Sequence, residues 1–188
     1  MKENKMKTIK IGKQEWSLKN LETDVFRDGT YLEQAVTWEE WKQFGKDKVP
    51  AWCYFDRNND GEYDNWEDNM SETYYNWYAV TDSRGLAPEG WHIPTIEEWE
   101  ELINYLGGEE ECIEKIISKD GLDINFDGRI LDDGGARGFG NSAYFWSSTE
   151  DDEYNALDFS VSPDSEYGII SMFGGYKEEG RNIRCVRD

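Results

Sequence analysis

The sequence predicts an α+β domain, and three observations support this fold class. Thr37 and Thr95 are each followed three residues later by Glu, an arrangement that marks the start of a helix. From Gly121 onward, short apolar and aromatic runs alternate with Gly, Asp and Ser, which predicts short strands and long loops. The 9 Trp, 11 Tyr and 8 Phe residues supply an aromatic core. Helices that precede strands without alternating with them favour α+β over parallel α/β.

The first elements along the chain are strands. Residues 8–11 alternate polar and apolar side chains and then meet Gly12, and the pattern resumes at Trp16, which together predict a β-hairpin. The apolar run 51–55 predicts a further strand. This run is also the longest apolar stretch, and it is far shorter than the roughly 20 residues that a membrane-spanning helix requires. We therefore expect no membrane insertion.

The two capping pairs open helices of different length. The first helix is expected over 38–44, with Gly45 ending it, because glycine favours helix C-termini. The helix after Thr95 is expected to end at Gly107, and its apolar residues share one face. Residues 111–118 repeat this one-sided pattern and predict a shorter helix. The apolar face of the longer helix comprises Trp99, Leu102, Ile103 and Leu106.

The C-terminal half completes one domain. Strands are expected within 144–146, 156–161, 168–173 and 183–186. The chain contains no fixed-period repeat and only 4 Pro, so no linker divides it. We expect residues 1–7 to form a flexible N-terminal tail and residues 8–188 to form a single domain.

The charge excludes several classes of partner. The 20 Lys and Arg residues stand against 41 Asp and Glu, which gives a net charge of −21. A protein this acidic is repelled by DNA, RNA and anionic lipid, so we expect no nucleic acid partner. Cations are the electrostatic partners that this charge favours.

Several phrases occur in the order found in one family. They include Ile11–Trp16, Tyr75–Val80 and the long phrase Arg84–Thr95, and they continue with Phe145–Thr149 and the closing Arg184–Asp188. These phrases resemble the Fibrobacter succinogenes major paralogous domain. The resemblance extends over nearly the whole chain from residue 8.

The resemblance implies a fold similar to C-type lectin domains and formylglycine-generating enzymes. In that fold, two helices pack on a small twisted antiparallel sheet and long C-terminal loops form the binding face. The family resemblance implies no defined reaction, because one fold hosts many functions. Formylglycine-generating enzymes use two closely spaced cysteines, and this sequence has no such pair, so that chemistry is not transferred.

The cysteines leave two alternatives open. Cys53 and Cys185 lie in family phrases on expected strands, where they could form a disulfide or remain two buried thiols. Cys112 lies on the apolar face of its helix and is expected to be a buried thiol. Residues 1–7 are basic but lack an apolar stretch, so no secretory signal peptide is present in the chain as given.

Residues 56–67 fit the calcium-loop pattern D-x-[DN]-x-[DN]-G-x5-E at every position. Ca²⁺ takes about six to eight oxygen ligands, and Gly61 permits the sharp turn that such a loop makes. The alternative is an acidic hairpin loop with Asn and Gly as turn residues, because a strand and not a helix precedes it. The predicted ligands of Ca²⁺ are Asp56, Asn58, Asp60, the carbonyl of Glu62, Asp64 and Glu67.

A second acidic stretch, 123–128, repeats the first half of this spacing but lacks the final Glu. The alternation of Leu122, Ile124 and Phe126 favours a strand with its acidic residues facing solvent.

His92, the single histidine, lies beside a capped helix, where packing is a commoner role for histidine than catalysis. We expect no enzyme activity.

The aromatic residues divide into two groups. Those on apolar stripes or in family phrases are expected in the core, and they are Trp16, Trp52, Trp77, Trp91, Trp99 and Trp146. Those in polar C-terminal loops are expected to bind a ligand, because aromatic faces stack on sugars and on protein side chains. These ligand-binding candidates are Tyr154, Tyr167 and Tyr176.

The sequence thus predicts a non-enzymatic ligand-binding module at a cell or virion surface, extracellular in location. We expect its C-terminal loops to recognise a glycan or a protein. The alternative is a structural or assembly subunit of a larger surface or phage particle. The oligomeric state does not follow from the sequence.

Overall fold

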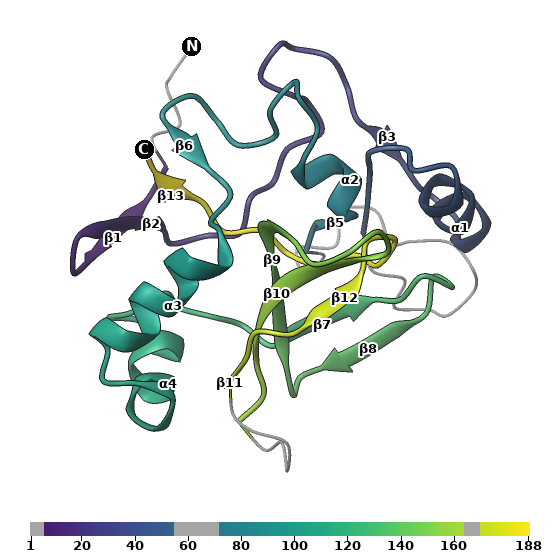
Figure 1. Cartoon of the computed structure of the whole chain (residues 1–188). Coiled ribbons are helices and arrows are strands. Elements are labelled where there is room, and N and C mark those ends of the chain that lie inside the picture. The colour runs from purple at the N-terminus through teal and green to yellow at the C-terminus, as the bar shows by residue number, and fades with distance from the viewer. Residues whose placement is uncertain (1–5, 55–71, 164–169) are drawn as a thin grey trace.

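The computed structural model describes residues 6–54, 72–163 and 170–188 (Figure 1). Within these ranges, four helices and thirteen strands form an α+β fold with three sheets, which confirms the predicted class. No helix in the described ranges is long and apolar enough to span a membrane.

The first sheet joins the two ends of the chain. Its strand order is β1-β2-β13-β6, and all three pairs are antiparallel. The hairpin predicted at the start of the chain is confirmed, with Ile11 directly opposite Gln14 across the turn. The strands are β1 (Thr8–Ile11), β2 (Gln14–Ser17), β6 (Trp91–His92) and β13 (Val186–Arg187).

The second sheet has the order β11-β10-β9-β7-β8, and β12 also pairs with β10. The long pair β9 and β10 is antiparallel and places Phe145 opposite Phe159. β7 and β9 run parallel, unlike the fully antiparallel sheet that was predicted. The strands are β7 (Asp127–Ile130), β8 (Ala136–Phe139), β9 (Ala143–Glu150), β10 (Asn155–Val161), β11 (Ile170–Ser171) and β12 (Gly174–Tyr176).

The third sheet has the order β3-β4-β5. β3 pairs with β4 in parallel, and β4 pairs with β5 in antiparallel orientation. The predicted strand at 51–55 is confirmed over its first three residues. The strands are β3 (Glu33–Gln34), β4 (Ala51–Cys53) and β5 (Tyr74–Tyr75).

The predicted helix starts are confirmed by their caps. The Thr37 hydroxyl caps α1 (Trp38–Lys46) and the Thr95 hydroxyl caps α3 (Ile96–Tyr105). In each helix the carboxylate of the Glu three residues later accepts from the backbone N–H of the same threonine. Gly45 lies inside α1 and does not end it, which corrects the prediction. A Cβ at Gly45 would lie 3.0 Å from Cβ of Glu178, so glycine here serves close packing.

The helix count differs from the two helices implied by the resemblance. The structure also contains α4 (Glu109–Ile117), which the one-sided apolar pattern predicts, and a short α2 (Trp77–Val80), which was not predicted. Asn76 caps α2 through its side chain. Residues 122–126 do not form the predicted strand, although Leu122 and Ile124 are buried as that pattern required.

The core is aromatic, as predicted. The six tryptophans assigned to it are all buried. Trp99 of α3 stacks on Phe159 of β10 with ring centroids 4.2 Å apart, and it also contacts Trp16 of β2 at 4.5 Å. Apolar residues from α3, α4 and the second sheet form one cluster. Figure 1 shows α3 and α4 together at one end of the molecule and α1 at the other.

Candidate ligand-binding surface

Three exposed aromatic side chains gather along one margin of the second sheet. Tyr154 precedes β10, while Phe173 and Tyr176 lie on the neighbouring segment, and these side chains are 66%, 76% and 55% exposed. The backbone N–H of Lys177 donates to the carbonyl of Tyr154 at 2.9 Å, and the backbone N–H of Asp158 donates to the carbonyl of Phe173 at 3.0 Å. We name Tyr154, Phe173 and Tyr176 the aromatic edge.

The turn that carries Tyr154 is fixed by one carboxylate. Oδ1 of Asp152 accepts hydrogen bonds from the backbone N–H groups of Tyr154 and Asn155, both at 2.7 Å, and from Nδ2 of Asn155 at 3.0 Å. The hydrogen bond from the Asn155 side chain and those from the two backbone groups lower the pKa of Asp152 below its ordinary value. The ionised carboxylate therefore holds this turn in one conformation.

A buried lysine ties the same turn to the adjacent strand. Lys177 is 4% exposed, and its Nζ donates to the carbonyls of Asp152 and Glu153 at 2.6 and 3.0 Å. Nζ also lies 2.5 Å from Oε1 of Glu150 and 4.9 Å from the centre of the Trp77 ring. These contacts satisfy the ammonium group, and they fix the position of the turn relative to β12.

A buried ion-pair cluster lies beneath β12. Arg181 is fully buried, its Nε donates to Oδ2 of Asp158 at 2.8 Å, and its Nη2 lies 2.8 Å from Oε2 of Glu179. The guanidinium also stacks over Trp146, 3.9 Å from the ring centre. Burial raises the pKa of Asp158 despite the opposing effect of Arg181. A Cβ at Gly175 would lie 1.8 Å from Nη2, so β12 rests directly on this cluster.

A second buried arginine lies near the first sheet. Nη1 of Arg184 donates to the carbonyl of Ser17 at 3.0 Å, and burial lowers the pKa of Arg184 to about 10. Partial burial, together with the nearby charge of Glu72, raises the pKa of Asp127 to about 6, and Arg184 opposes this rise. Asp127 therefore remains partly protonated in mildly acidic solution.

The structure places two of the three predicted tyrosines on adjacent segments of one sheet margin. Tyr154 and Tyr176 are both exposed, whereas Tyr167 lies outside the described residues. Phe173 was not predicted as a site residue, although a large apolar residue beside Gly174 and Gly175 was a signal available in the sequence. The burial of Lys177 and Arg181 had no such signal.

The predicted calcium ligands lie outside the described residues. Residues 55–71 include all six of them, namely Asp56, Asn58, Asp60, Glu62, Asp64 and Glu67. Within the described ranges, no group of three or more His, Cys, Asp or Glu side chains could hold a metal ion. This finding covers the second acidic stretch, 123–128, which therefore forms no such group.

The three cysteines lie in the core, and both nitrogens of the His92 ring have carboxylate partners. Cys53, Cys112 and Cys185 are buried thiols, so no disulfide joins Cys53 to Cys185. The ring nitrogens of His92 lie 2.9 Å from a carboxylate oxygen of Asp188 and 2.9 Å from one of Glu98, the capping residue of α3. Partial burial lowers the pKa of His92, but the hydrogen bonds to these carboxylates raise it overall.

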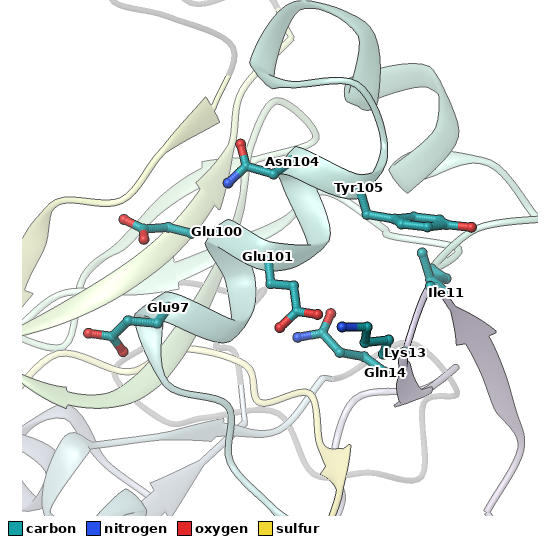
Figure 2. A pocket seen from close by; sticks show the side chains of 9 residues that line it. Ile11, Lys13, Gln14, Glu97, Glu100, Glu101, Asn104 and Tyr105 are labelled. Atoms are coloured by element: carbon teal, nitrogen blue, oxygen red, sulfur yellow. The ribbon is translucent and has the colours of Figure 1, made fainter.

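A cleft of about 710 Å³ lies between α3 and the turn of the first hairpin (Figure 2). In Figure 2, Glu101 points toward Lys13 and Gln14, whereas Glu97 and Glu100 point to the other side of the helix. Nε2 of Gln14 donates to the carbonyl of Glu98 at 2.8 Å, which attaches the hairpin to α3. The cleft is lined by Ile11, Gly12, Lys13, Gln14, Glu97, Glu100, Glu101, Asn104 and Tyr105.

Residues of the family phrases mainly support the fold. Oδ1 of Asn76 accepts from Ala51 and Ala79 at 3.1 Å, and it thereby joins β4 to α2. Nε1 of Trp77 donates to the carbonyl of Ser147 at 2.9 Å, and Nε1 of Trp146 donates to the carbonyl of Tyr75 at 2.8 Å. These buried bonds satisfy polar groups that would otherwise destabilise the core.

Comparison with known proteins identifies one family. The model of the Fibrobacter succinogenes major domain matches residues 9–118, which is more than half of the chain. No curated protein and no solved structure matches the chain. The aromatic edge lies outside the matched segment.

Proposed function

The chain belongs to the Fibrobacter succinogenes major domain family, and from this premise we propose that it is a non-enzymatic ligand-binding module. We place it at a cell or virion surface, where the aromatic edge recognises a glycan or a protein. We further propose that its fold is C-type-lectin-like. Calcium bound by residues 56–67 is a separate part of this proposal.

One observation carries the proposal: three large aromatic side chains lie exposed on a rigid margin of an otherwise strongly polar protein. The mean hydropathy of the chain is −0.87, yet Tyr154, Phe173 and Tyr176 are each more than half exposed. Rigid aromatic side chains bind at low entropic cost, since few torsions must be fixed. The Asp152 carboxylate and the buried Lys177 provide that rigidity.

The environment of His92 supports a non-enzymatic role. Both ring nitrogens already have carboxylate partners, and one of these, Glu98, is committed to capping α3. A histidine that acts as a general base must accept a proton from a nucleophile or a water molecule. The contacts of His92 instead link β6, α3 and the end of the chain.

The packing of α3 and α4 supports the proposed fold. Both helices contribute to one core cluster with Phe145 of β9 and Phe159 of β10, as expected for two helices packed on a sheet. β13 lies between β2 and β6, so the two ends of the chain share one sheet. The aromatic edge lies on the second sheet, and it is therefore separate from the margin where the chain ends meet.

The test uses the full chain immobilised and screened against a glycan array and a displayed library of random peptides. We expect a ligand whose binding falls by about tenfold or more in the double variant Tyr154→Ala, Tyr176→Ala, because buried aromatic anchors dominate binding energy. The matched control is Tyr105→Ala, since Tyr105 is as exposed as Tyr154 but lines the cleft beside α3.

Equal binding by wild type and the double variant would remove the aromatic edge as the ligand site. Loss of binding in Tyr105→Ala alone would transfer the site to the cleft. Light scattering of the wild type tests the rival role. A stable homo-oligomer without ligand in either screen would favour a structural or assembly subunit.

A further inference from the structure

The margin of the second sheet that carries Phe173 and Tyr176 is formed by one edge segment. β11 and β12 both pair with β10, and their registers agree, because Ser171 opposite Ser160 and Gly174 opposite Leu157 follow one continuous alignment. In the described ranges, β11 and β12 pair with no other strand (Figure 1). Residues 170–176 thus form the edge of the sheet opposite to β8, and we name them the edge segment.

The edge segment lacks the usual protection against strand pairing. Natural edge strands carry Lys, Pro or other charged residues that prevent another strand from adding. Residues 170–176 contain no charged residue and no Pro, although 32% of the chain is charged. Two adjacent glycines, Gly174 and Gly175, also remove the side chains that would keep a second backbone away.

The hydrogen-bond pattern identifies the residues whose backbone groups face outward. Phe173 and Lys177 bond to β10, and bonding direction alternates along an antiparallel strand. Gly175 therefore faces β10, while the N–H and C=O groups of Gly174 and Tyr176 point away from it. The Tyr176 carbonyl accepts from Glu179 at 2.9 Å. Gly174 is left as the centre of the outward-facing backbone.

The aromatic side chains lie on both sides of this backbone. Side chains alternate between the two faces of a strand, so Phe173 shares a face with Gly175 and Tyr176 lies on the opposite face. A Cβ on Gly175 would point at the buried Arg181 cluster. Phe173 therefore lies on the face of the strand that is turned toward this cluster. A strand added beside Gly174 would therefore contact one aromatic ring above and one below the sheet.

Charge favours a basic segment of another protein over a second copy of this chain as the strand that pairs with this edge. Two copies of a chain with net charge −21 repel each other, which argues against pairing of the edge with itself. Asp151 and Glu153 are exposed at the turn beside the edge, and Oδ2 of Asp151 lies 3.0 Å from the position of a Cβ on Gly174. A segment that carries Lys or Arg would place its charge beside these carboxylates.

We propose that an extended basic segment of a partner protein adds to the edge segment as a further β-strand. This inference rests on the proposed function and specifies the partner: main-chain hydrogen bonds at Gly174 supply affinity, and Lys or Arg beside Asp151 supplies selectivity. The rings of Phe173 and Tyr176 hold the added strand from its two faces.

The test compares two substitutions at one position. Gly174→Pro removes the outward N–H, whereas Gly174→Ala adds a Cβ and keeps the N–H. A displayed library of random ten-residue peptides is selected on the wild-type chain in 0.15 M NaCl, and the most enriched peptide is synthesised. We expect the Kd of this peptide to rise about tenfold or more in Gly174→Pro and to change less than about threefold in Gly174→Ala.

A second comparison covers the case in which Gly174→Pro does not fold. The enriched peptide is made with alternate backbone amides N-methylated, which removes strand hydrogen bonds and keeps every charge. Wild type should bind this peptide at least about tenfold more weakly. Protection of the Gly174 amide from hydrogen exchange by the unmodified peptide is expected as well.

The outcomes separate this inference from the proposed function. Equal binding of methylated and unmodified peptides, or of the Pro and Ala variants where both fold, overturns strand addition. If Tyr176→Ala still abolishes binding in that case, the aromatic edge remains the ligand site. If Tyr176→Ala has no effect either, both proposals fail. Failure of the library to yield any enriched peptide also overturns strand addition.

Discussion

Removal of Arg181 is the sharpest test of what supports the aromatic edge. Arg181→Met keeps most of the side-chain volume and deletes the guanidinium, which leaves Asp158, at 5% exposure, without its hydrogen-bonded cation. Glu179, at 6% exposure, then keeps only Arg129, whose Nη1 lies 3.4 Å from Oε2. The stacking contact with Trp146 at 3.9 Å is also weakened. Each of these losses weakens the contacts of the buried cluster that lies beneath β12.

The expected cost follows from the geometry. Removal of one partner from a buried, hydrogen-bonded ion pair typically costs about 3–5 kcal/mol, because the remaining charge is buried without compensation. For a chain of 188 residues, the entropy of unfolding is roughly 0.4 kcal/mol/K, so the melting temperature should fall by about 8–13 °C. Burial raises the pKa of Asp158, so the deficit should shrink as the pH falls and the carboxylate becomes neutral.

The assay is urea unfolding at pH 7.5 and pH 5, followed by tryptophan fluorescence. The matched control is Arg187→Met, because the Arg187 side chain is 55% exposed and pairs with Glu15 at the surface. Such exposed pairs contribute about 0–1 kcal/mol. Equal losses in Arg181→Met and Arg187→Met would refute the structural role of the buried cluster.

Substitutions at the neighbouring Gly174 and Gly175 test independently how β12 packs on the buried Arg181 cluster. Gly175→Ala places a Cβ 1.8 Å from Nη2 of the fully buried Arg181, so it should lower the melting temperature strongly. At Gly174 the nearest atom to such a Cβ is the Asp151 carboxylate oxygen at 3.0 Å, which can move. Gly174→Ala should therefore be tolerated, and comparable melting temperatures for the two variants would contradict the packing described for β12.

Three further predictions concern other regions. The folded pKa of Asp127 is raised to about 6, so ionisation destabilises the native state as the pH rises from about 4 to 6. Asp127→Asn should thus stabilise the fold at pH 7.5 by on the order of 1 kcal/mol after discount for solvent, with no gain at pH 3.5 in urea unfolding. Titration with a thiol reagent should find no reactive cysteine in the native protein and three in the unfolded, unreduced chain, whereas a count of one would reveal a disulfide. Calcium at a hundredfold excess over Kd should raise the unfolding free energy by about 2.7 kcal/mol, beyond NaCl of matched ionic strength, and the double variant Asp60→Ala, Glu67→Gln should lose this increment. Equal calcium responses in wild type and this variant would identify the loop as an acidic turn.

Local features of the fold could be predicted because their causes lie within a few residues. A Thr and a Glu three positions apart satisfy helix N–H groups wherever they occur, so the starts of α1 and α3 were predictable. The positive φ of Gly12 turns the first hairpin at the position that the alternation indicated. The tryptophans of the core could be recognised because a large apolar ring is stabilised by burial in almost any fold.

Local prediction failed where a distant segment decided the outcome. Gly45 had the signature of a helix end, but its role is to admit Glu178, far away in sequence. Residues 122–126 alternate as a strand does, yet among the described residues no strand pairs with 122–125. The ladder with β8 begins only where Gly140 donates to the carbonyl of Phe126, next to Asp127. The parallel pairs β3–β4 and β7–β9 depend on crossovers that local patterns do not specify.

The sequence by itself determined the exposure of Tyr154 and Tyr176, the capped helices, the family and the net charge of −21. Only the tertiary structure decided that Tyr154 and Tyr176 lie on adjacent segments, because the register of β10 with β12 places Tyr176 opposite Asn155. It also decided that Lys177 and Arg181 are buried. A buried charge is stable only where several partners converge, and those partners, from β9, β10 and the chain after β12, are assembled by the fold alone.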